Sequence, residues 1–220
     1  MKKIIMLAMV LGLLGLLGLV GTSHADMINV ALGGVATQSS TWNKGGYYAP
    51  ASLAIDGYTD APGEAPYIHQ ISHTYADYDP FSWWQVDLRN TYEIGSIVIW
   101  NRNENDGILE YEQMQARLSN LKVSVLSSDG TVVWDTIIPP ATYPIVGGFP
   151  DPSTYPNPSW TLYLPNDIEG QIVKIERLNQ DYLWFAEVQV YAVPEPATMF
   201  LLGSGLIGLA GLARKKFFKK

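Results

Sequence analysis

One aspartate of the chain stands in a setting that suits a metal ion. Asp56 is followed at once by Gly57, and this pair predicts a tight turn in which successive backbone carbonyls can point inward. Hard cations such as calcium take several oxygen ligands from carboxylates and backbone carbonyls. The turn therefore predicts either a calcium site or a plain turn in which Asp56 only satisfies the local backbone.

A histidine with aromatic neighbours suggests a second kind of chemistry. His73 is followed closely by Tyr75, Tyr78, Phe81 and Trp83. Imidazole donates or accepts hydrogen bonds, arginine adds a planar fork of donors, and exposed rings offer a flat apolar face. Sugars need this combination, because they present hydroxyl groups around an apolar ring. The alternative is a loop histidine beside aromatic residues of the core.

Short runs rich in β-branched and aromatic residues must position these groups. No helical period persists in the body, and the apolar residues of Leu121–Leu126 alternate with Lys122 and Ser124, as in a half-buried strand. Seven such runs predict an all-β jelly-roll sandwich. The predicted strands are Trp83 to Leu88, Ser96 to Trp100, Leu121 to Leu126, Thr131 to Ile138, Trp160 to Leu164, Ile172 to Leu178 and Leu183 to Tyr191.

Two connections are recognisable from their composition. Ser128, Asp129 and Gly130 predict a hairpin turn between two strands. The proline-rich segment 139–159 predicts a long loop, because proline cannot donate a backbone hydrogen bond within a sheet.

The N-terminus has the pattern of an export signal. Lys2 and Lys3 precede the uncharged apolar stretch 4–20, and small residues lead up to Ala25. We therefore expect a signal peptide over residues 1–25, removed by signal peptidase. The alternative is an uncleaved membrane anchor.

The C-terminus, residues 193–220, predicts a sorting device. Pro194, Glu195 and Pro196 precede an apolar run of membrane length, and the last seven residues are basic or aromatic. This order resembles the PEP-CTERM sorting signal of Gram-negative bacteria. The resemblance implies that the transmembrane helix enters the inner membrane and that an exosortase recognises the tripeptide and removes the tail. A plain tail anchor is the alternative.

The body, residues 26–192, is strongly acidic. Seven of the 14 basic residues lie in the two end segments, whereas 20 of the 21 acidic residues lie in the body, which leaves the body with a net charge of −13. This charge argues against nucleic acid and anionic lipid as partners. It favours a neutral ligand, a cation or both. Because the chain has no cysteine, no disulfide can brace it.

The body resembles the galactose-binding-like discoidin (coagulation factor type C) domain, and within it the fucolectins. Seven ordered motifs carry the resemblance, and together they cover nearly the whole body. They are Asn29–Leu32 with Ala36–Ser40, Ala54–Gly57, Ser72–Thr74, Trp83–Leu88, Ile97–Arg102, Arg117–Asn120 and Ala186–Tyr191. The resemblance implies a jelly-roll β-sandwich that binds ligands in loops at one end.

The resemblance also implies particular site residues. In fucolectins an aspartate, a glutamate and nearby carbonyls hold calcium. By position, Asp56 and Glu187 become the carboxylate ligands here. The carbonyl ligands become Leu53, Tyr58 and Ala186.

The fucolectin sugar site consists of one histidine and two arginines, which correspond here to His73, Arg102 and Arg117. The segment between the two arginines departs from the family pattern. It lacks the paired cysteines of the relatives, and an extra stretch at 108–115 places Arg117 further along the chain. The departure puts the convergence of Arg117 with the other two residues in doubt.

These observations predict a non-catalytic carbohydrate-binding module, exported to the cell surface or extracellular matrix, with a glycan or exopolysaccharide as its partner. Sequence motifs of common hydrolases and zinc enzymes are absent, so we do not expect an enzyme. The alternative is a structural or adhesion protein of the extracellular matrix or biofilm that has lost the sugar pocket. A phospholipid-binding role fits the acidic body poorly.

Overall fold

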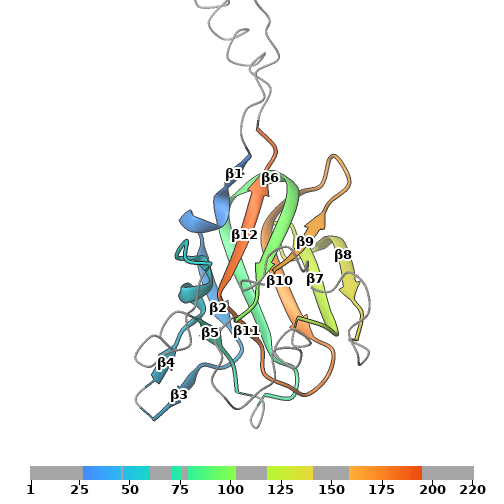
Figure 1. Cartoon of the computed structure of the whole chain (residues 1–220). Coiled ribbons are helices and arrows are strands. Elements are labelled where there is room, and N and C mark those ends of the chain that lie inside the picture. The colour runs from blue at the N-terminus through green and yellow to red at the C-terminus, as the bar shows by residue number, and fades with distance from the viewer. Residues whose placement is uncertain are drawn as a thin grey trace, which may run out of the picture.

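The computed structural model describes residues 27–45, 47–59, 71–75, 79–102, 118–140 and 159–194 (Figure 1). In these ranges no helix is long and apolar enough to cross a membrane. The helical elements are two short 3-10 turns, η1 (Val30–Gly33) and η2 (Ala51–Ile55). The strands are β1 (Ile28–Asn29), β2 (Val35–Gln38), β3 (Trp42–Lys44), β4 (Tyr47–Ala49), β5 (Ser72–His73), β6 (Trp83–Trp100), β7 (Leu121–Leu126), β8 (Val132–Ile138), β9 (Ser159–Tyr163), β10 (Glu169–Arg177), β11 (Trp184–Phe185) and β12 (Glu187–Ala192).

The long strand β6 belongs to both layers of the sandwich. Its first half pairs with β2 and β10, and β10 continues through β7 to β8. Its second half pairs with β12 and β9, and β12 pairs with β1. All of these pairings are antiparallel. The bend between the halves contains Arg89, whose φ of 67° is unusual for a residue with a side chain. The sequence therefore folds as an all-β sandwich, as predicted.

The core fills the space between the two layers. Trp84, Val86 and Leu88 alternate along β6 and are buried, as their spacing predicts. The Trp84 indole Nε1–H also donates to the carbonyl oxygen of Ala51 at 3.0 Å, which ties η2 to the core. Gly34 lies so close to β6 that an added Cβ would sit 2.5 Å from Val86 Cγ2. Layer packing and the position of η2 are thus linked through β6.

Several predicted strand boundaries differ from the observed ones. The two predicted strands on either side of Arg89 are one continuous strand, because β6 pairs with one layer before the bend and with the other layer after it. The predicted strand Leu183 to Tyr191 is divided at Ala186 into β11 and β12. The short strands β1 to β5 were not predicted, since strands of two to four residues carry too little periodic signal.

The hairpin between β7 and β8 is confirmed. Gly130 has φ of 85°, and its N–H donates to the Ser127 carbonyl oxygen at 3.0 Å. Asp129 caps the turn by accepting from the Ser127 hydroxyl and the Thr131 N–H. Of the predicted proline-rich loop, residues 141–158 lie outside the described ranges, as do the predicted signal peptide and tail helix.

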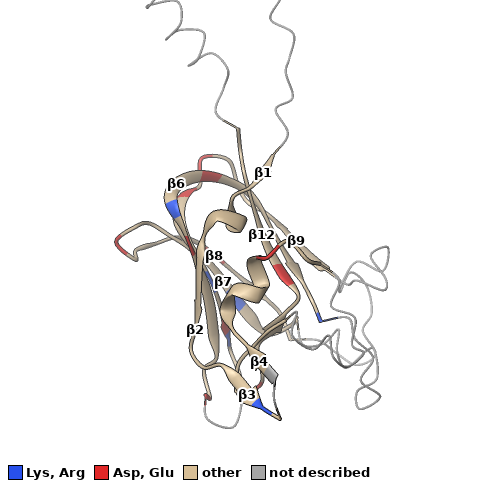
Figure 2. Ribbon diagram, turned by 90° about the vertical axis from the view of Figure 1, so that its left-hand side faces the viewer, with Lys and Arg blue, Asp and Glu red and all other residues tan. Residues whose placement is uncertain are grey.

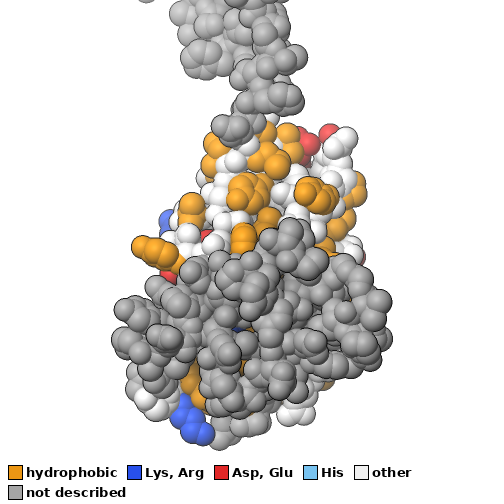
Figure 3. Space-filling model, viewed as in Figure 1, with side chains coloured by type: hydrophobic (Ala, Val, Ile, Leu, Met, Phe, Trp, Pro, Cys, Tyr) orange, Lys and Arg blue, Asp and Glu red, His pale blue; other side chains and the backbone are white. Residues whose placement is uncertain are grey.

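The two described ends of the chain lie side by side at one end of the sandwich, where β1 pairs with β12 (Figure 1). Apolar side chains are exposed at this end, among them Met27, Ile28 and Val193 (Figure 3). In Figure 2 the basic residues stand singly along the described part of the ribbon.

Candidate functional site

The first cluster joins η2 to the start of β12. The Glu187 carboxylate is fully buried and accepts from two backbone groups, the N–H of Asp56 at 3.1 Å and the N–H of Gly57 at 3.2 Å. Asp56 ends η2, and its own carboxylate accepts from the N–H of Tyr58 at 3.0 Å. The structure thus brings together two acids that lie 131 positions apart in the sequence.

The environment of these acids disfavours their negative charge. Burial raises the pKa of Glu187 from 4.5 to about 8, and the neighbouring Asp56 carboxylate adds to the rise, while the two N–H donors oppose it. Burial also raises the pKa of Asp56, although the Tyr58 N–H lowers it in part. No basic side chain among the described residues pairs with either acid. A pair of this kind needs a proton or a cation to be stable.

The predicted carbonyl donors lie on the segments that meet here. Leu53 is in η2, Tyr58 follows the Asp56–Gly57 turn, and Ala186 directly precedes Glu187. The described residues contain no group of three or more histidine, cysteine, aspartate or glutamate side chains that could hold a metal by themselves. A metal at this place would therefore need backbone carbonyls beside the two carboxylates.

The second cluster surrounds His73 on β5. The ring centroid of His73 lies 4.9 Å from Trp42, 5.2 Å from Tyr182 and 5.0 Å from Trp184. Its Nδ1 lies 2.6 Å from the carbonyl oxygen of Thr74, which can only accept, so the proton is on Nδ1. In the neutral ring Nε2 is then the acceptor. Three rings thus surround the imidazole, and the Thr74 carbonyl sets its tautomer.

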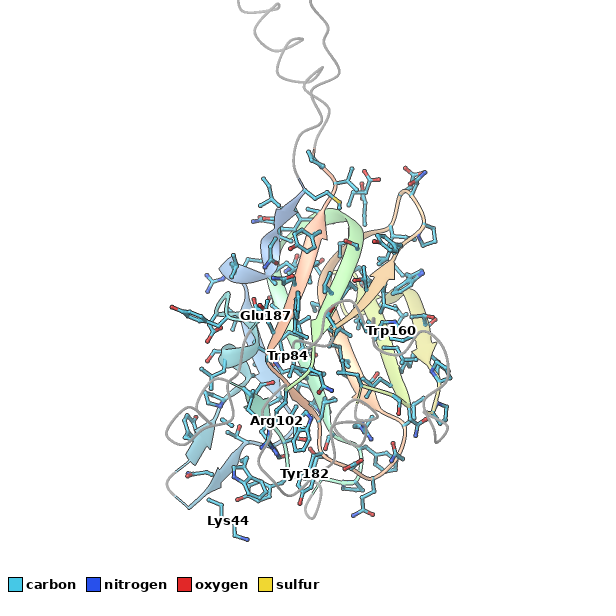
Figure 4. The ribbon with its side chains drawn as sticks, viewed as in Figure 1. Lys44, Trp84, Arg102, Trp160, Tyr182 and Glu187 are labelled. Atoms are coloured by element: carbon cyan, nitrogen blue, oxygen red, sulfur yellow. The ribbon has the colours of Figure 1, made fainter. Side chains whose placement is uncertain are left out.

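Arg102 joins this cluster from the end of β6. Its guanidinium carbon lies 4.8 Å from the centroid of the Trp184 ring, a cation–π arrangement, and the residue is 8% exposed. Figure 4 shows Arg102 and Tyr182 towards the end of the sandwich opposite the chain ends. The structure therefore brings His73 and Arg102 together through Trp184. Arg117 lies outside the described residues.

The two clusters are neighbours in the chain. Trp184 on β11 pairs with His73 on β5, and only two residues separate it from Glu187. The N–H of Ala186, between them, donates to the Trp100 carbonyl oxygen at 2.9 Å. Residues 185 and 186 therefore join the two clusters directly along the chain.

Sequence reasoning missed three rings of the second cluster. It proposed Tyr75, which stacks on Trp42 at 4.7 Å, but it did not single out Trp42, Tyr182 or Trp184. The signal for the last two was present, because residues two apart in an extended segment face the same side. Their rings are parallel, with an interplanar angle of 2°. Phe81 is largely exposed, and Tyr78 lies outside the described residues.

Two family models match the sequence. Residues 53–148 match the NedA-like, galactose-binding domain, and residues 192–215 match the PEP-CTERM protein-sorting motif. Residues 53–148 are thus similar to the galactose-binding domain of the discoidin, or coagulation factor type C, family. The resemblance recognised from the sequence is confirmed for both parts.

Similar proteins include lectins and sugar-binding modules. Fucolectin-3 of Anguilla japonica is 47% identical over 79 residues, and the match covers 34% of this chain and 39% of that protein. The chain therefore spans well under half the length of this curated relative. The lectin-binding domain of Lectinolysin, solved with Lewis b, is 26% identical with a TM-score of 0.58, covering 77% of this chain and 99% of that domain. A Streptococcus pneumoniae fucose-binding module, SpX-3, is 26% identical with a TM-score of 0.55, covering 76% of this chain and 99% of the module.

Proposed function

We propose that the galactose-binding domain is a glycan-binding module, with His73 and Arg102 as its polar anchors and Arg117 as a third. The observation that carries the proposal is the placement of the Arg102 guanidinium over Trp184, whose ring in turn lies beside His73. A histidine acceptor and a guanidinium donor fork suit sugar hydroxyls, and the surrounding rings suit the apolar face of a pyranose. The names of the similar modules favour fucose-containing glycans as first ligands to test.

The proposal extends to a structural calcium ion. The carboxylates of Asp56 and Glu187, with carbonyl oxygens of Leu53, Tyr58 and Ala186, form the ligand set. Two observations support this ligand set. Neither acid has a basic partner in the described part of the chain, and the pKa values of both are raised. A divalent ion, when bound, neutralises both charges. It would then fix η2 to β12 and so brace the loops around His73.

Location follows from the two end segments. We propose export across the inner membrane of a Gram-negative bacterium after signal-peptide cleavage at Ala25, followed by exosortase processing at Pro194–Pro196. The matched sorting motif supports surface or extracellular placement. Pro194 is the last described residue, so Glu195 and Pro196 lie outside the described ranges. The partner is then an extracellular polysaccharide or a surface glycan.

A glycan array tests the function. The full chain in detergent micelles is applied to fucosylated, galactosylated and unrelated glycans, with calcium or with a chelator. The proposal expects binding to fucose- or galactose-containing glycans that weakens strongly in the chelator. Absence of any sugar signal from the folded, calcium-loaded protein would favour the structural or adhesion role instead.

A melting experiment tests the ion separately. Calcium at 100 times its dissociation constant stabilises a protein by about 2.7 kcal/mol. We expect calcium to raise the melting temperature of the wild-type chain and to have little effect on Asp56→Ala. Equal responses of the two proteins to calcium would remove the metal from the proposal and leave glycan binding to be judged by the array.

A further inference from the structure

Three consecutive residues at the end of β2, Gln38, Ser39 and Ser40, contact several segments of the candidate site. The Gln38 side-chain nitrogen Nε2 lies 3.0 Å from the Ala49 carbonyl oxygen and 3.2 Å from the His73 carbonyl oxygen. Its amide group therefore donates both to the β3–β4 hairpin and to β5. One side chain holds the hairpin that carries Trp42 against the strand that carries His73.

The two serines connect the same region to the segment before β6. Ser39 and Ser40 both donate their hydroxyl to the Asp79 carboxylate, Ser40 at 2.9 Å. The Ser39 hydroxyl also accepts from the N–H of Trp83 at 3.0 Å. Asp79 therefore gathers two hydroxyl groups and fixes their orientation, so that each oxygen is free to accept a backbone N–H.

The path from Asp79 leads directly to the rings. The Ser40 hydroxyl accepts from the N–H of Tyr75 at 3.0 Å. The Tyr75 ring stacks on Trp42 at 4.7 Å, and its hydroxyl donates to the Asn43 carbonyl oxygen at 3.3 Å. Trp42 in turn contacts His73. Each contact joins residues more than 30 positions apart in the sequence.

We propose that Gln38, Ser40 and Asp79 are positioning residues of the glycan site. They touch no sugar; they set the place of the Trp42–Tyr75 ring pair relative to His73 and Arg102. The inference rests on the proposed function, because it assigns these residues to that same site. It also gives a role to the Ala36–Ser40 motif, which the metal and sugar ligands leave unexplained.

The chain offers a matched control for Ser40. In the β7–β8 hairpin, Ser127 likewise donates its hydroxyl to an aspartate, Asp129 at 2.6 Å, but this pair lies in an exposed turn. Ser127→Ala therefore removes the same kind of bond without touching the rings. Ser40→Thr is the conservative variant, since it keeps the hydroxyl that Ser40→Ala removes.

The experiment measures two quantities on the full chain in detergent micelles, well below the melting temperature. The first is the affinity for L-fucose by calorimetry. The second is the proton chemical shift of the His73 ring by NMR, which the neighbouring aromatic rings displace. We expect Ser40→Ala and Gln38→Glu to weaken fucose binding about tenfold and to move the His73 signal towards the value of a free histidine, whereas Ser40→Thr and Ser127→Ala leave both near wild type.

The two readouts separate this inference from the proposed function. If wild-type protein does not bind L-fucose but Ser40→Ala still moves the His73 signal, the choice of sugar fails and the positioning role stands. If Ser40→Ala leaves both the His73 signal and the fucose affinity at wild-type values, the positioning role is wrong. An equal effect of Ser127→Ala on either readout would also overturn it.

Discussion

The β7–β8 hairpin and the site end of the molecule use the same chemical groups in opposite ways. In the hairpin, Asp129 accepts hydrogen bonds from residues two positions away. These bonds lower the pKa of Asp129 to about 2, and the bond from the Ser127 hydroxyl contributes most. At the site end, Glu187 accepts from backbone groups 130 positions away or more, and burial raises its pKa to about 8. The hairpin stabilises a charge in water, whereas the site end confines a charge that needs compensation.

The two regions differ in what satisfies their polar groups. The hairpin acid is satisfied by its own turn, so nothing else is required of its surroundings. The site end gathers η2, β5, β11 and β12 around groups that no single segment satisfies. The proposed ion site and the proposed sugar site both lie in this second region.

Among the substitutions that test this comparison, we expect the largest effect on ligand binding at the site end. Arg102→Ala removes the donor fork over Trp184, and we expect affinity for fucosylated glycan to fall about 100-fold, because hydrogen bonds to a charged group contribute about 1.5–3 kcal/mol. Calorimetry measures the change. Lys122→Ala on β7, which removes the same charge from its bridge to Asp135, is the control and should bind as wild type. Wild-type affinity in Arg102→Ala would contradict the assignment.

The next effect concerns pH and the acid pair. In chelator, the folded chain holds the Glu187 proton more tightly than the unfolded chain does, because its pKa rises from 4.5 to about 8 on folding. The resulting stabilisation is complete below about pH 4.5 and is lost as the pH rises towards 8. Relative to Glu187→Gln, we expect wild-type stability to fall by at least about 2 kcal/mol across this window, measured by urea unfolding. Parallel pH profiles of the two proteins would rule out this explanation.

A smaller effect is expected in the hairpin. Gly130 has φ of 85°, so Gly130→Ala places a side chain in the left-handed region and should lower the free energy of unfolding by about 1 kcal/mol. Thermal unfolding measures this loss. Because the hairpin is a local unit, glycan affinity should not change; a joint loss of affinity would show that the two regions are coupled.

The smallest effect is expected at the surface bridge of β7 and β8. Lys122 and Asp135 are 3.0 Å apart with substantial exposure, and such pairs contribute about 0–1 kcal/mol. Lys122→Ala should therefore change the free energy of unfolding by less than about 0.5 kcal/mol in urea titrations. A larger loss would mean that the edge of this sheet depends on charge more than its exposure indicates.

Local chemistry made part of the molecule predictable from sequence. The β7–β8 turn needs only Asp129 and Gly130, and the alternation in Trp84, Val86 and Leu88 is enough to identify a core strand. The continuity of β6 through Arg89 was not predictable, because it depends on pairing with two different layers rather than on the propensity of the residues at the bend, where Arg89 has φ of 67°.

The candidate site was less predictable from sequence patterns than the hairpin and the core strand. The proximity of Asp56 and Glu187 was expected only from the family resemblance, and no pattern in the sequence links residues 131 positions apart. Tyr182 and Trp184 reach His73 through the pairing of β5 with β11, two short strands without periodic signal. Trp42 reaches it from the equally short strand β3. Ligand contacts of His73, Arg102 and Arg117 stay predictions.

The course of β12 has a mechanical consequence. This strand starts beside the rings at Glu187 and ends at Ala192, where the chain leaves the sandwich, and six of its residues pair with β6 (Figure 1). A pull between a held ligand and the C-terminal end runs along the strand. The load then falls on all rungs of this ladder at once, in shear, instead of opening them one after another.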